Sequence, residues 1–101
     1  MIRSYLRTLK ITLNKSIIDI VEVVKDAVEG NSEIAEKKKI IFEFEHPEYE
    51  VLIDADKDKF ALAFNALINN AIKFTNEDGR VKVIVQDHFK DVEIIISDTG
   101  I

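Results

Sequence analysis

Hydrophobic residues recur along the chain with two different periods, and these periods predict where its helices and strands lie. In residues 56–75 the spacing alternates between four and three, which places the apolar side chains in one stripe along a helix. The stripe consists of Phe60, Phe64, Leu67, Ala71 and Phe74. Asp54 and Asp56 are both suitable N-cap residues for this central helix, because a carboxylate accepts hydrogen bonds from the free amides of a first turn.

A second helix is predicted from Ser16 to about Lys38. Ser16 is followed three residues later by Asp19, which resembles a capping box. Apolar residues then continue at helical spacing, namely Ile17, Val21, Val24, Val28 and Ala35. A glycine costs roughly 1 kcal/mol relative to alanine inside a helix. We therefore expect a local distortion at Gly30, within a helix that otherwise runs through.

Five short segments have the composition or the period-two alternation of strands. They are residues 9–13, 40–44, 51–54, 81–85 and 92–96, and the last two form a hairpin through residues 87–90. Residues 76–79 are a predicted turn with Gly79 at a positive φ, and residues 1–9 are a candidate tail of an upstream helix. The pattern predicts a single α+β domain over residues 1–101, a two-layer sandwich. Two long helices pack on one face of a mixed, largely antiparallel sheet.

Charge and composition exclude several classes of function. The chain has 14 basic and 19 acidic residues, a net charge of −5, which argues against a nucleic-acid surface and against a polybasic membrane contact. It has no cysteine, which excludes a disulfide scaffold and a cysteine-ligated zinc site. No apolar run reaches the length of a signal peptide or a membrane span. We expect this segment to be cytoplasmic, which is compatible with a membrane-anchored parent protein.

Polar residues with candidate chemistry lie on a second face of the central helix and at the end of the last strand. Ala66, Asn70 and Lys73 are again spaced by four and three, so their side chains lie one above another. Leu62 and Ala63 border this face, and we expect the amide and the ammonium to lie beside buried surface. Asp98, Thr99 and Gly100 follow the strand at residues 92–96.

These two places carry a resemblance to a known family. Residues 56–75, which close with the sequence Asn-Ala-Ile-Lys-Phe-Thr, resemble the N-box of the ATP-binding domain of sensor histidine kinases. Asp98, Thr99 and Gly100 resemble the start of its first glycine box. The resemblance implies an incomplete Bergerat-type fold, as in the wider superfamily of gyrase, Hsp90 and MutL. It implies an ATP-dependent protein-histidine kinase as part of a longer two-component protein, whose catalytic domain binds Mg-ATP and donates the γ-phosphate.

The resemblance also implies a role for each matching residue. Asn70 would bind Mg²⁺, Lys73 would contact the phosphates of ATP, and Asp98 would accept a hydrogen bond from the adenine amino group. Gly100 would let the backbone approach the base closely. The wall of the pocket would include Ala66, Phe74 and Thr99. No catalytic residue is assigned in this chain.

The partners follow from the same resemblance. In the family the accepting histidine lies on a separate helical dimerisation domain, so the resemblance implies that this residue lies upstream. His46 and His88 both lie in predicted turns, and neither is expected to be the acceptor. The other partner would be the response regulator of the parent kinase.

Three departures from the family pattern change what we expect. Ala66 stands where the family commonly has a second Asn, and where gyrase-like ATPases have a Glu that acts as general base, so a gyrase-like hydrolase is disfavoured. Lys39 stands where a glycine often closes the first helix. The sequence stops before the second glycine box, the lid and the last helix and strands. The strand at residues 92–96 is then expected to keep an unpaired apolar edge that favours self-association. This fragment alone is expected to be weak or inactive.

Other readings of the same residues stay open. Asn70 and Lys73 alone are more often ordinary residues of a polar helix face. Asp98 with Thr99 and Gly100 also matches the signature of aspartic proteases, although the two preceding helices disagree with that fold. The alternative function is a non-catalytic fragment or relative that acts as a protein-interaction scaffold, with Ala66 as the mark of lost chemistry.

Overall fold

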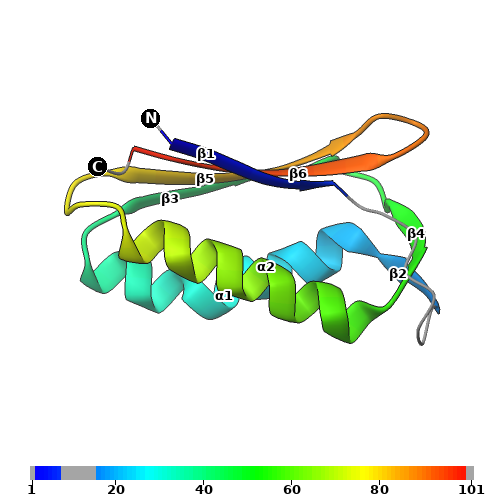
Figure 1. Ribbon diagram of the computed structural model, residues 1–101, viewed down its shortest axis with the longest axis horizontal. Coiled ribbons are helices and arrows are strands. Elements are labelled where there is room, and N and C mark those ends of the chain that lie inside the picture. The colour runs from blue at the N-terminus through cyan, green and yellow to red at the C-terminus, as the bar shows by residue number, and fades with distance from the viewer. Residues whose placement is uncertain (1, 8–15, 100–101) are drawn as a thin grey trace.

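A computed structural model describes residues 2–7 and 16–99 of the chain, and of residues 2–7 only the backbone. The sheet forms one layer and the two helices form the other, both on the same face of the sheet (Figure 1). This arrangement confirms the predicted α+β sandwich. The elements in chain order are β1 (Ile2–Arg7), β2 (Ser16–Asp19), α1 (Ile20–Lys37), β3 (Ile41–Glu45), β4 (Leu52–Ala55), α2 (Lys57–Lys73), β5 (Arg80–Asp87) and β6 (Val92–Asp98).

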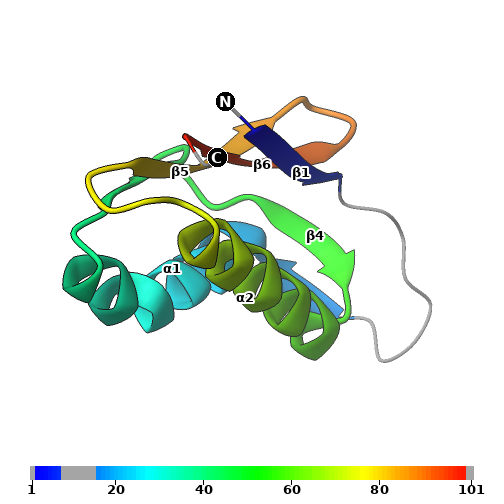
Figure 2. The same cartoon turned by 60° about the vertical axis from the view of Figure 1, so that its left-hand side comes forward.

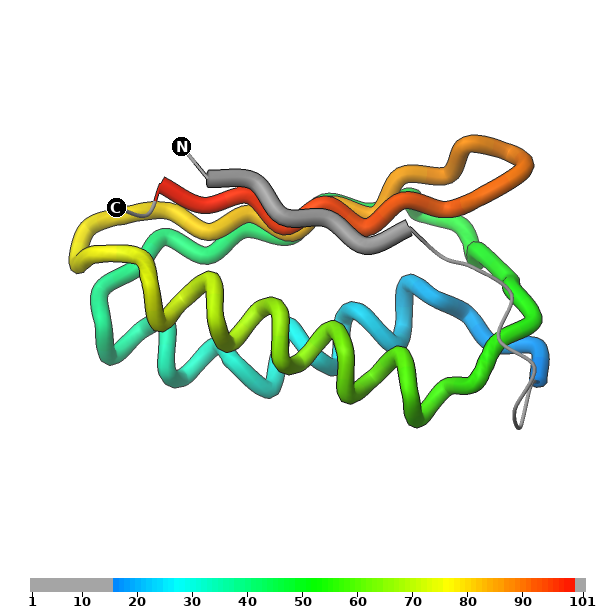
Figure 3. The backbone as a smooth tube through the Cα atoms, viewed as in Figure 1, coloured from blue at the N-terminus to red at the C-terminus, as the bar shows by residue number. Residues whose placement is uncertain are grey.

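The main sheet is mixed, as the sequence predicts. Its four strands lie in the order β1-β6-β5-β3, with β3 parallel to β5 and the other two pairs antiparallel. Strands β2 and β4 form a separate two-stranded antiparallel ribbon. Figure 2 shows α1 and α2 side by side beneath the sheet. The β5–β6 hairpin lies at the end of the molecule opposite to the last residues of β6 (Figure 3).

The core lies between the sheet and the helices, and it is apolar on both sides. Alternate residues of β5 and β6 point into it, and α2 contributes a stripe of large side chains. All of the following are buried: Val81, Val83, Val85, Val92, Ile94, Ile96, Phe60, Phe64, Ile68 and Ile72. Burial of this apolar surface is the main force that holds the two layers together.

Helix α1 begins later than the sequence predicts, because Ser16–Asp19 is the strand β2. Asp19 is the N-cap: its carboxylate accepts hydrogen bonds from the backbone N–H of Val21 at 3.0 Å and of Val51 at 3.2 Å. The capping-box interpretation was therefore wrong, since Asp19 caps the helix itself instead of lying in its first turn. The helix does run through Gly30, which remains α-helical, and a Cβ added there would meet no atom within 4 Å.

The N-terminal region corrects two further predictions. Ile2–Arg7 is a strand and not the tail of a helix, and it pairs antiparallel with β6 from Ile2 opposite Asp98 to Arg7 opposite Glu93. The edge of β6 is therefore covered by β1, and the expected unpaired edge at residues 92–96 was wrong. An open edge exposes a row of free N–H and C=O groups, which pairing with β1 satisfies. Self-association through that edge loses its basis. The strand predicted at residues 9–13 lies outside the described residues.

Two turns show which residues take a positive φ. In the turn after α2 this residue is Asp78, with φ of 68°, and not Gly79 as predicted. Gly79 is required for a different reason: a Cβ there would lie 2.4 Å from the side chain of Thr75 and 2.9 Å from the hydroxyl oxygen of Thr99. At the end of α1, Lys39 has φ of 61°, a backbone conformation that favours glycine.

Neither described helix combines the length and the apolar character that a membrane span requires.

Candidate functional site

Helix α2 carries two of the predicted site residues, and its own caps define where it begins and ends. Asp56 is buried and is the N-cap; its side chain accepts a hydrogen bond from the backbone N–H of Lys59 at 3.2 Å. Phe74 is the C-cap, and its backbone N–H donates to the carbonyl of Asn70 at 3.0 Å. Of the two predicted N-cap candidates, Asp56 and not Asp54 takes the position.

The buried stripe of α2 only partly matches the prediction. Phe60, Phe64 and Ala71 are buried as expected, and Leu67 is half-buried. Phe74 is 56% exposed, because the helix ends there and its periodicity no longer applies. Ile68 and Ile72 complete the core-facing side.

Asn70 and Lys73 are exposed on the outer side of α2, together with Ala66. Their expected position beside buried surface was wrong, since the neighbouring Leu62 is 73% exposed. The ammonium of Lys73 lies 5.8 Å from the centroid of the Phe74 ring, a cation–π contact at the end of the helix. An amide, an ammonium and an aromatic ring are thus presented to solvent within the last turns of α2.

Asp98 lies on the side of the sheet that the helices cover. Alternate side chains of a strand point to the same face, so Asp98 shares a face with Ile94 and Ile96, both of which belong to the core. It is 7% exposed and is the last residue of the strand. The end of β6 and the C-terminal end of α2 lie at the same end of the molecule in both views (Figures 1 and 2). The fold therefore brings Asp98 to the same end and the same side of the sheet as Asn70 and Lys73.

Hydrogen bonds fix the residue that follows α2 and the residue that follows β6. The hydroxyl of Thr75, which is fully buried, donates to the carbonyl of Ala71 at 2.7 Å. Thr99 is bound to the start of β5: its hydroxyl oxygen accepts from the N–H of Arg80 at 2.9 Å, and its own N–H donates to the carbonyl of Arg80 at 3.0 Å. Thr99 thus has a structural contact in addition to its predicted place in a pocket wall. Gly100 lies outside the described residues.

Sequence reasoning missed two polar residues that contact α2, namely Asn31 in α1 and Lys38 at the C-cap of α1. Asn31 is 2% exposed and makes side-chain hydrogen bonds to Asn65 and Asn69. The ammonium of Lys38 donates to the backbone carbonyls of Ile72 at 3.0 Å and Lys73 at 2.7 Å. The position of Asn31 on the apolar side of α1, seven residues after Val24, was the signal that could have identified it.

The run of three lysines at the end of α1 divides into three different contacts. Lys37 forms an ion pair with Glu33 within the helix, and Lys39 forms one with Glu77. Lys38 instead caps the end of α2. A cation at a helix C-terminus is favourable, and the helix that benefits from Lys38 is the neighbouring one.

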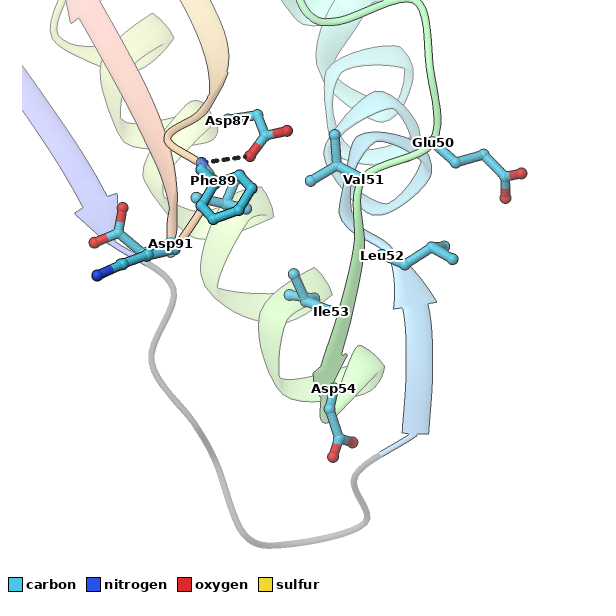
Figure 4. Close-up of a pocket in the computed structure, with 10 residues that line it drawn as sticks. Glu50, Val51, Leu52, Ile53, Asp54, Asp87, Phe89 and Asp91 are labelled. Atoms are coloured by element: carbon cyan, nitrogen blue, oxygen red, sulfur yellow. Dashed lines mark hydrogen bonds between the residues drawn. The ribbon is translucent and has the colours of Figure 1, made fainter.

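One groove in the described ranges lies away from the predicted site residues. A groove of about 380 Å³ lies between β4 and the β5–β6 hairpin, with Val51 and Ile53 across from Phe89 (Figure 4), and its lining includes neither Asn70 nor Asp98. The described residues contain no group of three or more His, Cys, Asp or Glu side chains that could hold a metal ion.

The pKa of Tyr49 is raised above its ordinary value because its hydroxyl donates to the carboxylate of Asp87.

Comparisons with known proteins identify the fold. No protein-family model matches the chain. Over 99 residues it is 31% identical to the sensor histidine kinase YclK of Bacillus subtilis (strain 168); the match covers 95% of this chain and 20% of that protein. The catalytic domain of histidine kinase ThkA matches with a TM-score of 0.83 at 22% identity, over 88% of this chain and 60% of that one. The structure of ThkA in complex with the response regulator protein TrrA matches with a TM-score of 0.80 at 23% identity, over 86% and 26% of the two chains. The chain has the fold of a histidine kinase catalytic domain and spans about a fifth of the Bacillus protein.

Proposed function

Because the chain is similar in fold and sequence to sensor histidine kinases, we propose that it is part of the ATP-binding domain of a two-component sensor kinase and that it binds Mg-ATP. The observation that carries this proposal is the place of Asp98. It lies on the helix-covered side of the sheet, at the end where α2 presents Asn70 and Lys73. A carboxylate on the other face of the sheet could not share a ligand with these two side chains.

The chemistry of the three side chains fits the parts of Mg-ATP. Mg²⁺ prefers oxygen ligands and keeps several of its waters, so the single amide oxygen of Asn70 is a sufficient protein ligand beside bound phosphates. The ammonium of Lys73 is a flexible point charge for phosphate oxygens. The carboxylate of Asp98 is an acceptor for the amino group of adenine. Gly100 keeps its predicted role beside the base.

The residues predicted for the pocket wall are compatible with this arrangement. Ala66 and Phe74 are exposed on the side of α2 that carries Asn70 and Lys73, and Thr99 directly follows Asp98. Bound Mg-ATP would supply the phosphoryl group. The residues of this chain would bind and orient the nucleotide and neutralise its charge, which is most of what phosphoryl transfer asks of a protein.

The partners of this domain are proposed from the family likeness. A histidine on an upstream dimerisation domain would accept the phosphoryl group. A response regulator would receive it in turn, and the ThkA–TrrA complex supports this partner because its kinase shares the present fold. The chain alone would bind ATP weakly and would not phosphorylate itself.

One observation favours the alternative of a non-catalytic scaffold. Ala66 offers no polar atom one turn before Asn70, so the outer side of α2 has fewer groups for phosphates and metal than the family pattern provides. A scaffold would keep the fold without binding Mg-ATP, and nucleotide titration therefore separates the two functions.

The test is a titration of the isotope-labelled chain with Mg-ATP, followed by NMR. We expect weak binding that shifts the amide signals at the end of α2 and at the end of β6, and a Kd in the low micromolar range would contradict the expected weakness. Asn70→Asp and Asp98→Asn should abolish binding in the chain and autophosphorylation in the parent kinase. The matched controls are Asn76→Asp in the exposed turn and Asp58→Asn in the first turn of α2. Unchanged binding in both site variants would reject the assignment.

A further inference from the structure

We propose that Asn31 of α1 is a positioning residue for the nucleotide site: it fixes the rotation of α2 about its own axis, so that Asn70 and Lys73 face the site. This inference rests on the proposed function. It assigns a role to a residue that lies on the other helix and faces a side of α2 different from the one that carries Asn70.

The contacts of Asn31 leave little freedom to its side chain. Its Nδ2 donates to the carbonyl of Ala27 at 2.8 Å and to Oδ1 of Asn65 at 2.9 Å. Its Oδ1 accepts from Nδ2 of Asn69 at 3.3 Å. The amide of Asn31 is thus held by its own helix and by two residues of α2, and it is 2% exposed.

Asn65 and Asn69 are one helical turn apart, so both lie on the side of α2 that faces α1. Successive residues of a helix are about 100° apart around its axis. When Asn69 is held against α1, Asn70 must point to a side about 100° away, where the structure shows it exposed. The direction of the proposed Mg²⁺ ligand is therefore coupled to a hydrogen bond made by the residue just before it.

The apolar contacts of α2 do not specify its rotation as sharply. Ile68, Ala71 and Ile72 are buried, but apolar contact is not directional, whereas a hydrogen bond is. A rotation would, however, separate the amides of Asn65 and Asn69 from Asn31. The amide of Asn31 is buried, and a buried amide that loses its partners is strongly disfavoured. A single buried asparagine fixes the register of coiled coils by the same principle.

Lys38 adds a second contact on the same side of α1. It follows Asn31 by about two helical turns and binds the carbonyls of Ile72 and Lys73. Asn31 therefore fixes the rotation of α2, while Lys38 holds its C-terminal end, where Lys73 lies. The two residues together orient the half of α2 that carries the proposed ligands.

The test uses Asn31→Leu, which replaces the amide by an apolar side chain of similar volume. The control is Val24→Ala, which weakens packing on the same helix at a fully buried site without touching the three asparagines. The chain has no cysteine, so spin labels can be placed at Glu29→Cys on α1 and Leu62→Cys on α2, both exposed, for distance measurement by electron paramagnetic resonance. Mg-ATP affinity is measured separately by NMR titration of the unlabelled variants.

We expect Asn31→Leu to broaden the distance distribution and to raise the Kd for Mg-ATP about tenfold. A loss of this size is typical of residues that orient a ligating side chain without contacting the ligand themselves. Val24→Ala should lower the melting temperature and leave both readouts unchanged. If Asn31 had a merely structural role, Asn31→Leu would behave as Val24→Ala does. A narrow distribution or an unchanged Kd in Asn31→Leu would overturn the inference. If Asn31→Leu does not fold, the same two readouts are measured for Asn69→Ala, which removes only the donor to Oδ1 of Asn31. A narrow distribution or an unchanged Kd in that variant would likewise overturn the inference.

The same experiment separates the inference from the proposed function. If the unaltered chain does not bind Mg-ATP, the proposed function fails, and the inference about a nucleotide site fails with it. In that case the distance distribution still decides whether Asn31 fixes the rotation of α2. If the unaltered chain binds and Asn31→Leu binds equally well, only the inference fails.

Discussion

The two surfaces on which α2 packs are built from different chemistry. On its sheet side α2 belongs to an apolar core that includes Val83, Ile94 and Ile96. Against α1 it also meets the buried amide of Asn31 and the ammonium of Lys38. Apolar contact is strong but not directional, whereas hydrogen bonds are directional and contribute modestly to stability. The comparison indicates that the sheet side of α2 provides most of its stability and the α1 side determines its orientation.

The largest expected effect tests the sheet side of this comparison. Phe64 is fully buried and stacks on Phe60, with the ring centroids 5.6 Å apart. Phe64→Ala should lower the free energy of unfolding by about 4 kcal/mol, because it removes apolar contact and leaves a cavity. Urea denaturation measures this loss. Leu62→Ala, on the exposed side of the same helix, is the control and should change the free energy by less than about 0.5 kcal/mol. Similar losses in both variants would contradict the burial that defines the core.

An intermediate effect tests the α1 side. Lys38→Met keeps the apolar stem of the side chain and removes the ammonium that binds the carbonyls of Ile72 and Lys73. We expect a loss of about 1 kcal/mol in the free energy of unfolding, the usual contribution of a cation at a helix C-terminus. Faster amide exchange in the last turn of α2 should accompany it.

The control for Lys38 is its neighbour in the chain. Lys37→Met breaks only an exposed ion pair with Glu33, which is typically worth about 0.3 kcal/mol. Equal effects of the two substitutions would show that Lys38 acts only as a surface charge. The claim that Lys38 helps to orient α2 would then be wrong.

The difference between apolar faces and specific polar contacts also explains how much of the fold the sequence could predict. Periodicity identifies apolar faces, so the presence of both helices, the hairpin of β5 and β6 and the core residues Phe60, Phe64 and Ala71 were predicted correctly, although the start of α1 was not. Periodicity does not reveal pairing between distant segments. The strand at Ile2–Arg7 is defined only by β6, and Ser16–Asp19 is a strand only because β4 lies beside it.

The candidate site shows the same limit. The motifs identified Asn70, Lys73 and Asp98, and the alternation of β6 explains why Asp98 faces the helices. The roles of these residues stay predictions. The hydrogen bond that Asn31 donates to Asn65 joins residues 34 positions apart, and no local pattern in the sequence specifies such a contact.

The smallest expected effect concerns a polar contact that neither buries surface nor orients a helix. The hydroxyl of Tyr49 donates to the carboxylate of Asp87 at 3.1 Å, and both side chains are exposed. Ionisation of the phenol would remove this hydrogen bond and place two negative charges together, so the pKa of Tyr49 is raised above its ordinary value of 10.0. The contact should therefore stabilise the fold fully below the pKa of an unfolded tyrosine. Its contribution should disappear as the pH rises through the higher pKa of the folded state.

A spectroscopic titration tests this expectation. The chain has two tyrosines, so the difference in phenolate absorbance between the unaltered chain and Tyr49→Phe reports Tyr49 alone. Asp87→Asn removes the charge of the acceptor but keeps an oxygen for the N–H of Phe89, which Asp87 also binds. It should return the pKa of Tyr49 toward its ordinary value. An unshifted pKa in the unaltered chain would show that this contact does not persist in solution. Exposed polar contacts would then differ from the contacts of the buried amide of Asn31 between α1 and α2, which we expect to hold their geometry.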